Sequence, residues 1–240
     1  MAESVSEESA ERLWGLRDRP VPKTRPTLNL ERVAAAAIDL ADSEGMPAVS
    51  MQQVAARLDV TKMALYRHVA NKAELVAVMI ETAVGEPPDL TAIPHWRERL
   101  VTWAEGMREA WQRHPWIPVA TVGDRMEGPR EIGWTESAVA ALEDTGLDGA
   151  ERMDAVFLLS GHIRNTQSTG TAGTQPWTRG RELDPVITDL LARHGYAFPA
   201  LAAATASANG APLDNGWRFG LDRILDGLAV LIDSRAAPRG

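Results

Sequence analysis

The sequence predicts an all-α protein, in which an N-terminal three-helix helix-turn-helix module of the homeodomain-like type precedes a larger helical domain. Three observations lead to this prediction. Apolar residues recur at spacings of three and four, the period of an amphipathic helix. Val, Ile and Thr do not alternate with polar residues, so strand signals are almost absent. Glycines and prolines fall between the periodic segments, where helices end.

Length and composition limit the class of protein. The chain has 240 residues, 45% of them hydrophobic, which is enough for one large or two modest domains. It has no cysteine, which excludes disulfides, thiolate metal sites and cysteine nucleophiles. Its N-terminus is acidic and is not a secretory signal, and no stretch reaches the roughly 18–20 apolar residues of a membrane span. We expect a cytoplasmic protein without membrane association.

The net charge of −8 is unevenly distributed. Residues 17–72 carry nine Lys and Arg against six Asp and Glu, a net +3, whereas residues 73–240 carry a net −8. A local basic excess attracts phosphate even in an acidic chain. A chance fluctuation gives the same numbers, so charge alone does not identify a nucleic-acid binder.

Residues 1–28 are predicted to be a flexible N-terminal arm. The segment ends in RDRPVPKTRPT, whose prolines and alternating charges disfavour a packed helix. Its basic residues are Arg17, Arg19, Lys23 and Arg25. Two interpretations stay open: a solvated tail, or an arm that reaches the minor groove of DNA.

Residues 29–75 are predicted to form the helix-turn-helix module. Four polar residues that suit N-caps precede apolar periodic segments, namely Asn29, Ser50, Thr61 and Asn71. Gly45 can end the first helix in a left-handed conformation. Helices near 50–58 and 61–69 are separated by a turn of about three residues, the spacing of a helix-turn-helix. Asp59 occupies the turn position that requires a left-handed residue.

The second helix of this motif should enter the major groove with its N-terminal end. Lys62 and Arg67 can reach phosphate or guanine, and Met63 can contact a thymine methyl group. Lys72 combines a positive charge with the free backbone donors of the next helix. The predicted DNA-binding residues are Ser50, Gln52, Thr61, Lys62, Met63, Tyr66, Arg67 and Lys72. We interpret His68 as a packed structural residue.

Prolines 87, 88 and 94 separate this module from the second domain, which we place at residues 76–236. Helices are expected there near 94–114, 129–145, 148–167, 184–194 and 216–234. An alanine-rich stretch before residue 215 is expected to be mobile.

Aromatic and apolar side chains of the second domain predict a cavity for a hydrophobic or aromatic small molecule. The chain has eight tryptophans, which is many for its length. The candidate ligand-binding residues are Trp103, Met107, Trp111, Trp116, Met126, Trp134, Phe157, His162 and Asn165. Each of them could instead fill the core or a dimer interface.

An enzyme is the alternative that the sequence disfavours. None of the five histidines stands in a metal-spacing motif or beside a nucleophile motif, and there is no glycine-rich phosphate loop. We expect no catalytic residue, no metal and no cofactor.

The motif T-x-x-A-L-Y-R-H-V-x-N-K-x-E-L at residues 61–75 resembles the tetracycline-repressor (TetR) family. HPWIP at 114–118 and WRFGLD at 217–222 extend the resemblance to about residues 28–234. It implies nine or ten helices and a homodimer formed by the helix near 148–167 and the last helix. It also implies a ligand-released repressor that binds a palindromic double-stranded DNA operator. An activator with the same DNA-binding module stays the alternative.

Two departures from the tetracycline repressor concern its magnesium–drug site. That protein uses a histidine after its fifth helix and a glutamate after its eighth. The corresponding segments here read VATVGDRMEGP, without a histidine, and TQSTGTAGT, without a carboxylate. We therefore predict no response to magnesium–tetracycline and leave the ligand's identity open.

Overall fold

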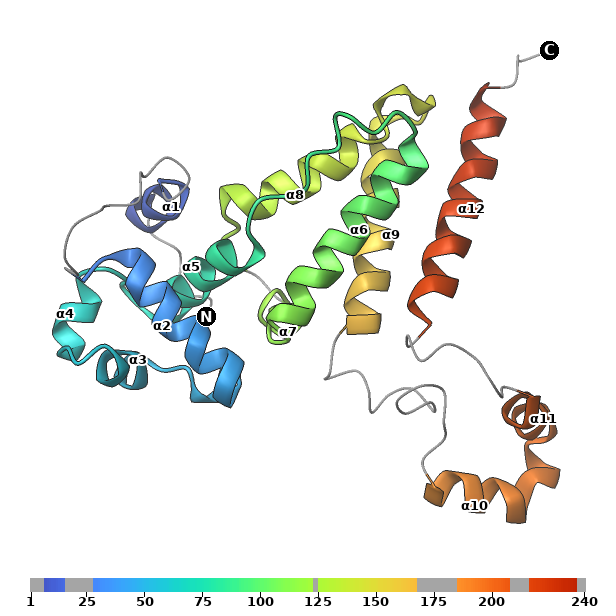
Figure 1. Ribbon diagram of the computed structural model, residues 1–240, viewed down its shortest axis with the longest axis horizontal. Coiled ribbons are helices and arrows are strands. Elements are labelled where there is room, and N and C mark those ends of the chain that lie inside the picture. The colour runs from blue at the N-terminus through green and yellow to red at the C-terminus, as the bar shows by residue number, and fades with distance from the viewer. Residues whose placement is uncertain (1–6, 16–27, 123–124, 168–184, 208–215, 237–240) are drawn as a thin grey trace. The chain divides into compact units, whose positions relative to one another are not determined.

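The computed structural model describes residues 7–15, 28–122, 125–167, 185–207 and 216–236 (Figure 1). These residues form helices and turns and contain no strand, which confirms the predicted all-α class. The chain divides into two compact units, Met1–Val156 and Phe157–Gly240. None of the helices in the described ranges is long and apolar enough to cross a membrane.

The first unit holds the helices from the N-terminus to the start of α9. Their bounds are α1 (Glu7–Trp14), α2 (Leu30–Glu44), η1 (Met46–Ala48), α3 (Met51–Arg57), α4 (Lys62–Tyr66), α5 (Lys72–Val84), α6 (Trp96–Arg113), α7 (Ile117–Ala120), α8 (Pro129–Ala140), η2 (Glu143–Thr145) and α9 (Gly149–Gln167). Helix α2 contacts α3 and α5, and α3 contacts α4, so these helices form one small bundle (Figure 1). Val33, Val54 and Leu65 are completely buried in it.

The four side chains predicted to cap helix N-termini do so in the structure. Each of the four predicted N-cap side chains accepts a hydrogen bond from the backbone N–H three residues later: Asn29 from Arg32 at 2.9 Å, Ser50 from Gln53 at 3.2 Å, Thr61 from Ala64 at 3.2 Å and Asn71 from Glu74 at 2.8 Å. Such caps contribute about 1 kcal/mol each.

The turn residues agree with the prediction in one case and differ in the other. Asp59 has a φ of 54° and is the one non-glycine residue with positive φ in the described ranges, which confirms its left-handed place. Gly45 has φ 82° and ψ 165°. This conformation requires glycine, but it is not the left-handed helical one that we expected.

The prediction of a flexible N-terminal arm is wrong for residues 7–14, which form the helix α1. Leu13 in this helix is 1% exposed, and α1 contacts α5. The prolines did not prevent the helix because all three lie after its last residue, at positions 20, 22 and 26. Arg17, Arg19, Lys23 and Arg25 lie outside the described residues.

One boundary in the first unit differs from the sequence prediction, and one short helix was not predicted. The helix expected to reach residue 145 ends at Ala140, and Gly146 adopts a left-handed conformation after η2. The HPWIP segment ends α6 and then opens the short α7, in which Pro118 lies in the first turn, where its missing N–H costs nothing.

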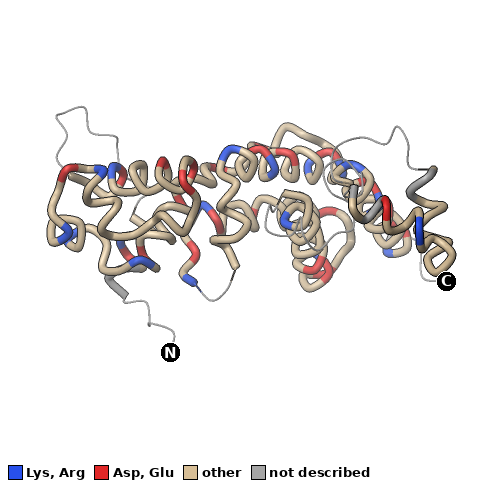
Figure 2. Tube along the Cα trace, turned by 90° about the horizontal axis from the view of Figure 1, so that it is seen from below, with Lys and Arg blue, Asp and Glu red and all other residues tan. Residues whose placement is uncertain are grey.

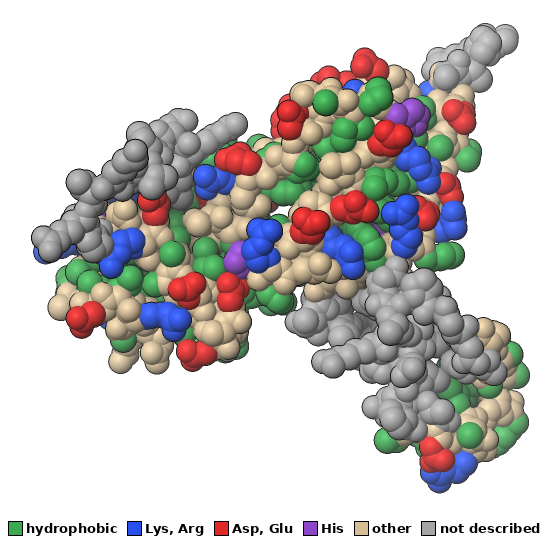
Figure 3. All heavy atoms as spheres, in the orientation of Figure 1, with side chains coloured by type: hydrophobic (Ala, Val, Ile, Leu, Met, Phe, Trp, Pro, Cys, Tyr) green, Lys and Arg blue, Asp and Glu red, His purple; other side chains and the backbone are tan. Residues whose placement is uncertain are grey.

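The second unit contains the rest of α9 followed by α10 (Pro185–His194), η4 (Gly195–Ala197), α11 (Pro199–Ser207) and α12 (Trp217–Ala236). The alanine-rich stretch contains α11 because alanine has the highest helix propensity. Several large apolar side chains of α10 and of the residues that follow it are exposed: Val186, Leu190, Tyr196 and Phe198. Figure 3 shows hydrophobic side chains, in green, on the surface of this part of the chain.

Candidate nucleic-acid interface

Helix α4 separates its side chains into a buried and an exposed set. Leu65 is completely buried and so is Val69, just beyond the helix. Met63 is 72% exposed and Tyr66 is 38% exposed. Lys62 and Arg67 are also exposed. The side chains predicted to contact DNA therefore lie on the solvent side, while the apolar positions fix the helix to the bundle.

The basic and aromatic side chains of α4 lie together. Lys62 Nζ is 5.7 Å from the centre of the Tyr66 ring, within the range of a cation–π interaction. Along the described part of the chain, Lys and Arg positions are interspersed with Asp and Glu positions (Figure 2). Lys62 and Tyr66 therefore place a positive charge and an aromatic hydroxyl close together on the exposed side of α4.

The hydroxyl groups predicted to contact DNA are partly used as caps. The oxygens of Ser50 and Thr61 each accept a backbone hydrogen bond. A hydroxyl keeps its own O–H donor after accepting. Both side chains can therefore still donate to a phosphate oxygen, and the exposed Gln52 lies in the first turn of α3.

The start of α5 is fixed by a buried carboxylate. Glu74 Oε2 accepts the backbone N–H of Ala70 at 2.6 Å, and Glu74 Oε1 lies 3.2 Å from Arg12 Nε of α1. The side chain of Glu74 is only 3% exposed. Lys72, two residues earlier, is exposed. The buried Glu74 side chain thus fixes the corner between α4 and α5, while the side chain of Lys72 is exposed to solvent.

His68 is half-buried at the end of α4. Burial lowers the pKa of its imidazole, and the positive charges of Arg12 and Arg67 lower it further. A neutral imidazole gains little from a phosphate, which supports the structural role predicted for His68.

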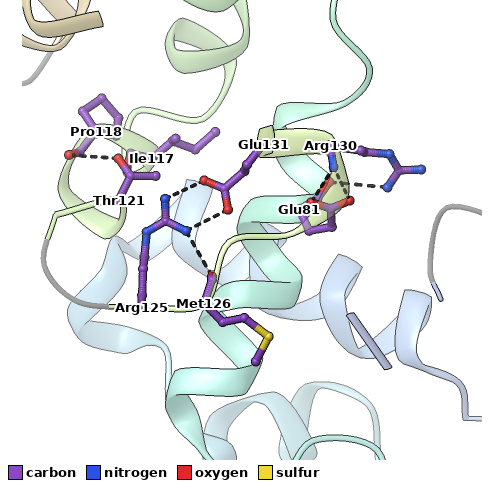
Figure 4. A network of polar contacts seen from close by, with 8 residues as sticks. All are labelled: Glu81, Ile117, Pro118, Thr121, Arg125, Met126, Arg130 and Glu131. Carbon is purple, nitrogen blue, oxygen red and sulfur yellow. Dashed lines mark hydrogen bonds and ion pairs between the residues drawn. The ribbon is translucent and has the colours of Figure 1, made fainter. Parts of the chain in front are cut away.

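The far end of α5 meets the start of α8 through Glu81 (Figure 4). Glu81 is completely buried, and its two carboxylate oxygens accept the backbone N–H of Arg130 at 3.0 and 3.1 Å. The N-cap of α8 is Gly128, which has no side chain to cap the helix. Glu81 therefore supplies the cap from another helix, where a negative charge also suits the helix dipole.

The side chains around this joint reinforce it. Arg130 Nε donates to Glu86 at 2.9 Å, just beyond α5. Arg125 binds both oxygens of Glu131, at 2.5 and 2.7 Å (Figure 4). A bidentate arginine–carboxylate pair orients both groups, so the segment before α8 is held against that helix.

We expect Glu81 to make stability depend on pH. Burial raises the pKa of its carboxyl, and hydrogen bonds and charge from Arg130 oppose that rise only in part. Above the unfolded-state pKa of about 4.3, Glu81 therefore binds more protons in the folded state than in the unfolded state. The contribution of Glu81 to the free energy of unfolding then falls as pH rises, until the pH reaches the raised pKa of the folded state.

Glu81→Gln keeps an oxygen for the N–H of Arg130 but does not titrate. The difference in free energy of unfolding, wild type minus variant, should therefore decrease as pH rises above about 4.3. Urea denaturation of both proteins across this range measures it. A difference that is constant with pH would contradict the prediction.

Trp116 has a polar contact that the sequence did not predict. Its Nε1 donates to Asp42 Oδ1 of α2 at 2.7 Å, and His114 Nδ1 lies 3.0 Å from both oxygens of the same carboxylate. Asp42 thereby joins α2 to the turn between α6 and α7. Trp116, a candidate ligand-binding residue, is buried in this contact.

Two other candidate ligand-binding tryptophans are brought together. Trp103 and Trp134 pack edge to face with ring centres 6.2 Å apart, and Trp103 Nε1 donates to the carbonyl of Trp134 at 2.8 Å. Trp134 Nε1 donates to the carbonyl of Gly85, at the end of α5. These tryptophans therefore link α6, α8 and the end of α5.

The remaining candidates occupy different environments. Trp111 is buried, and Met107 and Met126 are half-buried in the first unit. In the second unit His162 stacks on Trp217 and lies 2.9 Å from its carbonyl, whereas Phe157 is 83% exposed and Asn165 is exposed. In the described ranges no group of three His, Cys, Asp or Glu residues could hold a metal ion.

Sequence reasoning missed Arg12, Asp42, Glu81 and Gly128. Of these four residues, only Glu81 could have been identified from the sequence. It lies three residues after Val78, a helical spacing that places both residues on the buried side of α5. The other three contact residues far away in the sequence, which no local spacing reveals.

Comparison with known proteins identifies the family. Residues 33–79 match the family described as bacterial regulatory proteins, tetR family. Residues 90–232, more than half of the chain, match the tetracyclin repressor-like C-terminal domain. The chain belongs to the tetR family. The predicted resemblance is therefore confirmed in both parts of this tetR-family protein.

Curated and solved relatives agree with this assignment. The HTH-type transcriptional repressor DrrR1 of Streptomyces coeruleorubidus is 31% identical over 238 residues, covering 94% of this chain and 86% of the relative. An apo crystal structure of ActR from Streptomyces coelicolor matches with a TM-score of 0.72 at 22% identity, covering 89% of this chain and 100% of that one. ActR in complex with actinorhodin matches with a TM-score of 0.69 at 25% identity, covering 86% and 97%. The tetR-family protein is thus a DNA-binding transcriptional regulator and not an enzyme, as the sequence predicted.

Proposed function

We propose that this regulator is a repressor that binds a palindromic operator as a homodimer and is released by a small hydrophobic molecule. The observation that carries the DNA contact is the division of α4, with Leu65 and Val69 buried and Lys62, Met63, Tyr66 and Arg67 exposed. We assign the DNA-binding module to residues 29–75 and ligand binding and dimerisation to residues 76–236. The protein acts in the cytoplasm, where a bacterial operator lies.

The DNA contacts divide into two kinds. Lys62, Met63 and Arg67 contact base edges or phosphates in the major groove, and Tyr66 donates its hydroxyl to a phosphate. Lys72 binds phosphate at the N-terminus of α5, where the helix dipole adds to its charge. Ser50, Gln52 and Thr61 contact phosphates or base edges next to them. Two modules that bind half-sites one helical turn apart lie about 34–36 Å from each other.

Exposed apolar side chains on α9 and α12 support a dimer formed by these helices. They are Met153, Phe157 and Leu158 on α9 and Phe219 and Val230 on α12, and each is more than half exposed in the single chain. Such side chains are removed from water when a second copy covers them, which favours association.

We expect Phe157→Glu to convert the dimer to a monomer, because it places a charge where an apolar ring is buried by the partner. Sedimentation equilibrium of both proteins measures the molar mass. Val119→Glu, at an exposed residue of α7, is the matched control and should stay dimeric. A dimeric Phe157→Glu variant would show that α9 does not form the interface.

The effector class follows from the aromatic residues of the second domain. We propose that an aromatic ligand packs against Trp103, Met107, Trp111, Trp116, Met126 and Trp134 of the first unit. The other candidates from the sequence, Phe157, His162 and Asn165, belong to the second unit and stay predictions. The complex of the relative ActR with actinorhodin supports an aromatic effector. Magnesium–tetracycline should have no effect, since the histidine and glutamate of that site have no counterparts here.

A gel-shift assay with the protein's own promoter region tests the proposal, with actinorhodin as the probe ligand. We expect a shifted band at moderate salt that unrelated DNA does not displace and that actinorhodin removes. If there is no specific band, the repressor assignment is wrong. If the band forms but actinorhodin neither removes it nor quenches tryptophan fluorescence, the proposed effector class is wrong.

A further inference from the structure

Helix α1 packs on the DNA-binding module although it precedes the segment that matches the family, residues 33–79. It contacts α5, and its Leu13 is 1% exposed while the neighbouring Trp14 is 49% exposed. A fully buried leucine contributes about 1.5–3 kcal/mol relative to an exposed one, which is enough to hold a short helix in place.

Arg12 of α1 reaches the buried carboxylate that fixes the start of α5. Its Nε lies 3.2 Å from Glu74 Oε1, and the Glu74 side chain is 3% exposed against 31% for Arg12. A buried carboxylate is costly unless it is paired and hydrogen-bonded. Arg12 therefore supplies a charged partner for the buried Glu74 side chain.

Glu74 in turn controls the corner from which Lys72 projects. Its carboxylate accepts the N–H of Ala70, and its own N–H donates to the Asn71 side chain at 2.8 Å. Lys72 follows Asn71 directly and is exposed. The positive charge of Arg12 also lowers the pKa of His68, so this charge lies near the end of α4.

We propose that α1 is part of the DNA-binding module and that Arg12, acting through Glu74, is a positioning residue that aims Lys72 at a phosphate. The inference rests on the proposed phosphate contact of Lys72. We assign Arg12 no DNA contact of its own, because its Nε lies beside the buried Glu74 carboxylate.

A double-mutant cycle on the full-length protein tests this role, with binding to the protein's own promoter duplex as the measurement. The variants are Arg12→Gln, Lys72→Ala and the double variant. Arg12→Lys keeps the charge, and Trp14→Ala removes an exposed side chain of the same helix as the control. Circular dichroism establishes that each variant is folded.

We expect Lys72→Ala and Arg12→Gln each to weaken binding on the order of tenfold, with the double variant no weaker than Lys72→Ala alone. Arg12→Gln should also reduce the dependence of log affinity on log salt, by about 0.9 for each phosphate that the protein no longer binds, as Lys72→Ala does. Arg12→Lys and Trp14→Ala should bind as wild type does.

The outcomes distinguish the inference from the function on which it rests. If Lys72→Ala binds as tightly as wild type, the proposed contact of Lys72 is wrong. If Lys72→Ala is weak but Arg12→Gln is unchanged, or if the two effects multiply, Arg12 does not position Lys72. Equal reductions in affinity for Arg12→Gln and Arg12→Lys would also overturn the inference, since the charge would then not matter.

Discussion

Replacing Lys62 and Arg67 together by alanine should weaken operator binding by a factor of at least about 10³ while leaving the dimer intact. Each good base or phosphate contact contributes about 1–3 kcal/mol, and a dimer makes every contact twice. Both side chains are exposed beside the completely buried Leu65, so their removal leaves the core of the module unchanged.

Fluorescence anisotropy with a labelled promoter duplex at two salt concentrations measures the change in affinity. Arg113→Ala removes an exposed positive charge at the end of α6 and is the matched control, which should bind like wild type. An equally weak control would mean that overall charge, and not the exposed side of α4, determines binding. Unchanged binding by the double variant would show that α4 does not contact DNA.

Replacing Gly128 by alanine should destabilise the protein by about 1–3 kcal/mol, because overpacking a filled site forces side chains and backbone to move. A Cβ at this position would lie 2.1 Å from Glu81 Oε2 and 2.6 Å from its Cδ. Glu81 is completely buried, so it has little room to withdraw, and any withdrawal would also break its hydrogen bonds to the N–H of Arg130.

Gly133→Ala in the same helix is the control for Gly128→Ala. The nearest atom to a Cβ there is a Pro87 carbon at 4.0 Å, which is ordinary contact. Alanine inside a helix is favoured over glycine by about 0.5–1 kcal/mol, so this variant should be slightly more stable than wild type. Urea denaturation of both variants measures the difference. Equal stabilities would show that Gly128 is not required by Glu81.

The sequence predicted the DNA-binding module closely because short-range interactions form it. Asn29, Ser50, Thr61 and Asn71 each cap a helix through the N–H three residues later. Asp59 takes the left-handed turn that the spacing of the two helices required. Caps, turns and helical periodicity involve residues within about one helical turn of each other, so they can be read from the order of residues alone.

The larger domain could be predicted as helical but not in its contacts. The sequence predicted Trp116 as a ligand-binding residue from its side-chain type, but it did not predict that the Trp116 N–H donates to Asp42, which is 74 residues away in the sequence. Trp134 likewise donates to the carbonyl of Gly85. An aromatic side chain has the same sequence signature in a pocket, in a core or in a hydrogen bond between helices.

By itself the sequence determined the helical class, the family and the exposed side of α4, because each depends on local spacing or on a continuous motif. Only the tertiary structure decided that α1 joins the DNA-binding module and that Glu81 caps α8. Both depend on buried charges that need a distant partner: Glu74 lies beside Arg12, and Glu81 accepts the backbone N–H of Arg130. A buried carboxylate is stable only where the fold supplies such a partner, and the partner's place in the chain is not encoded in any spacing.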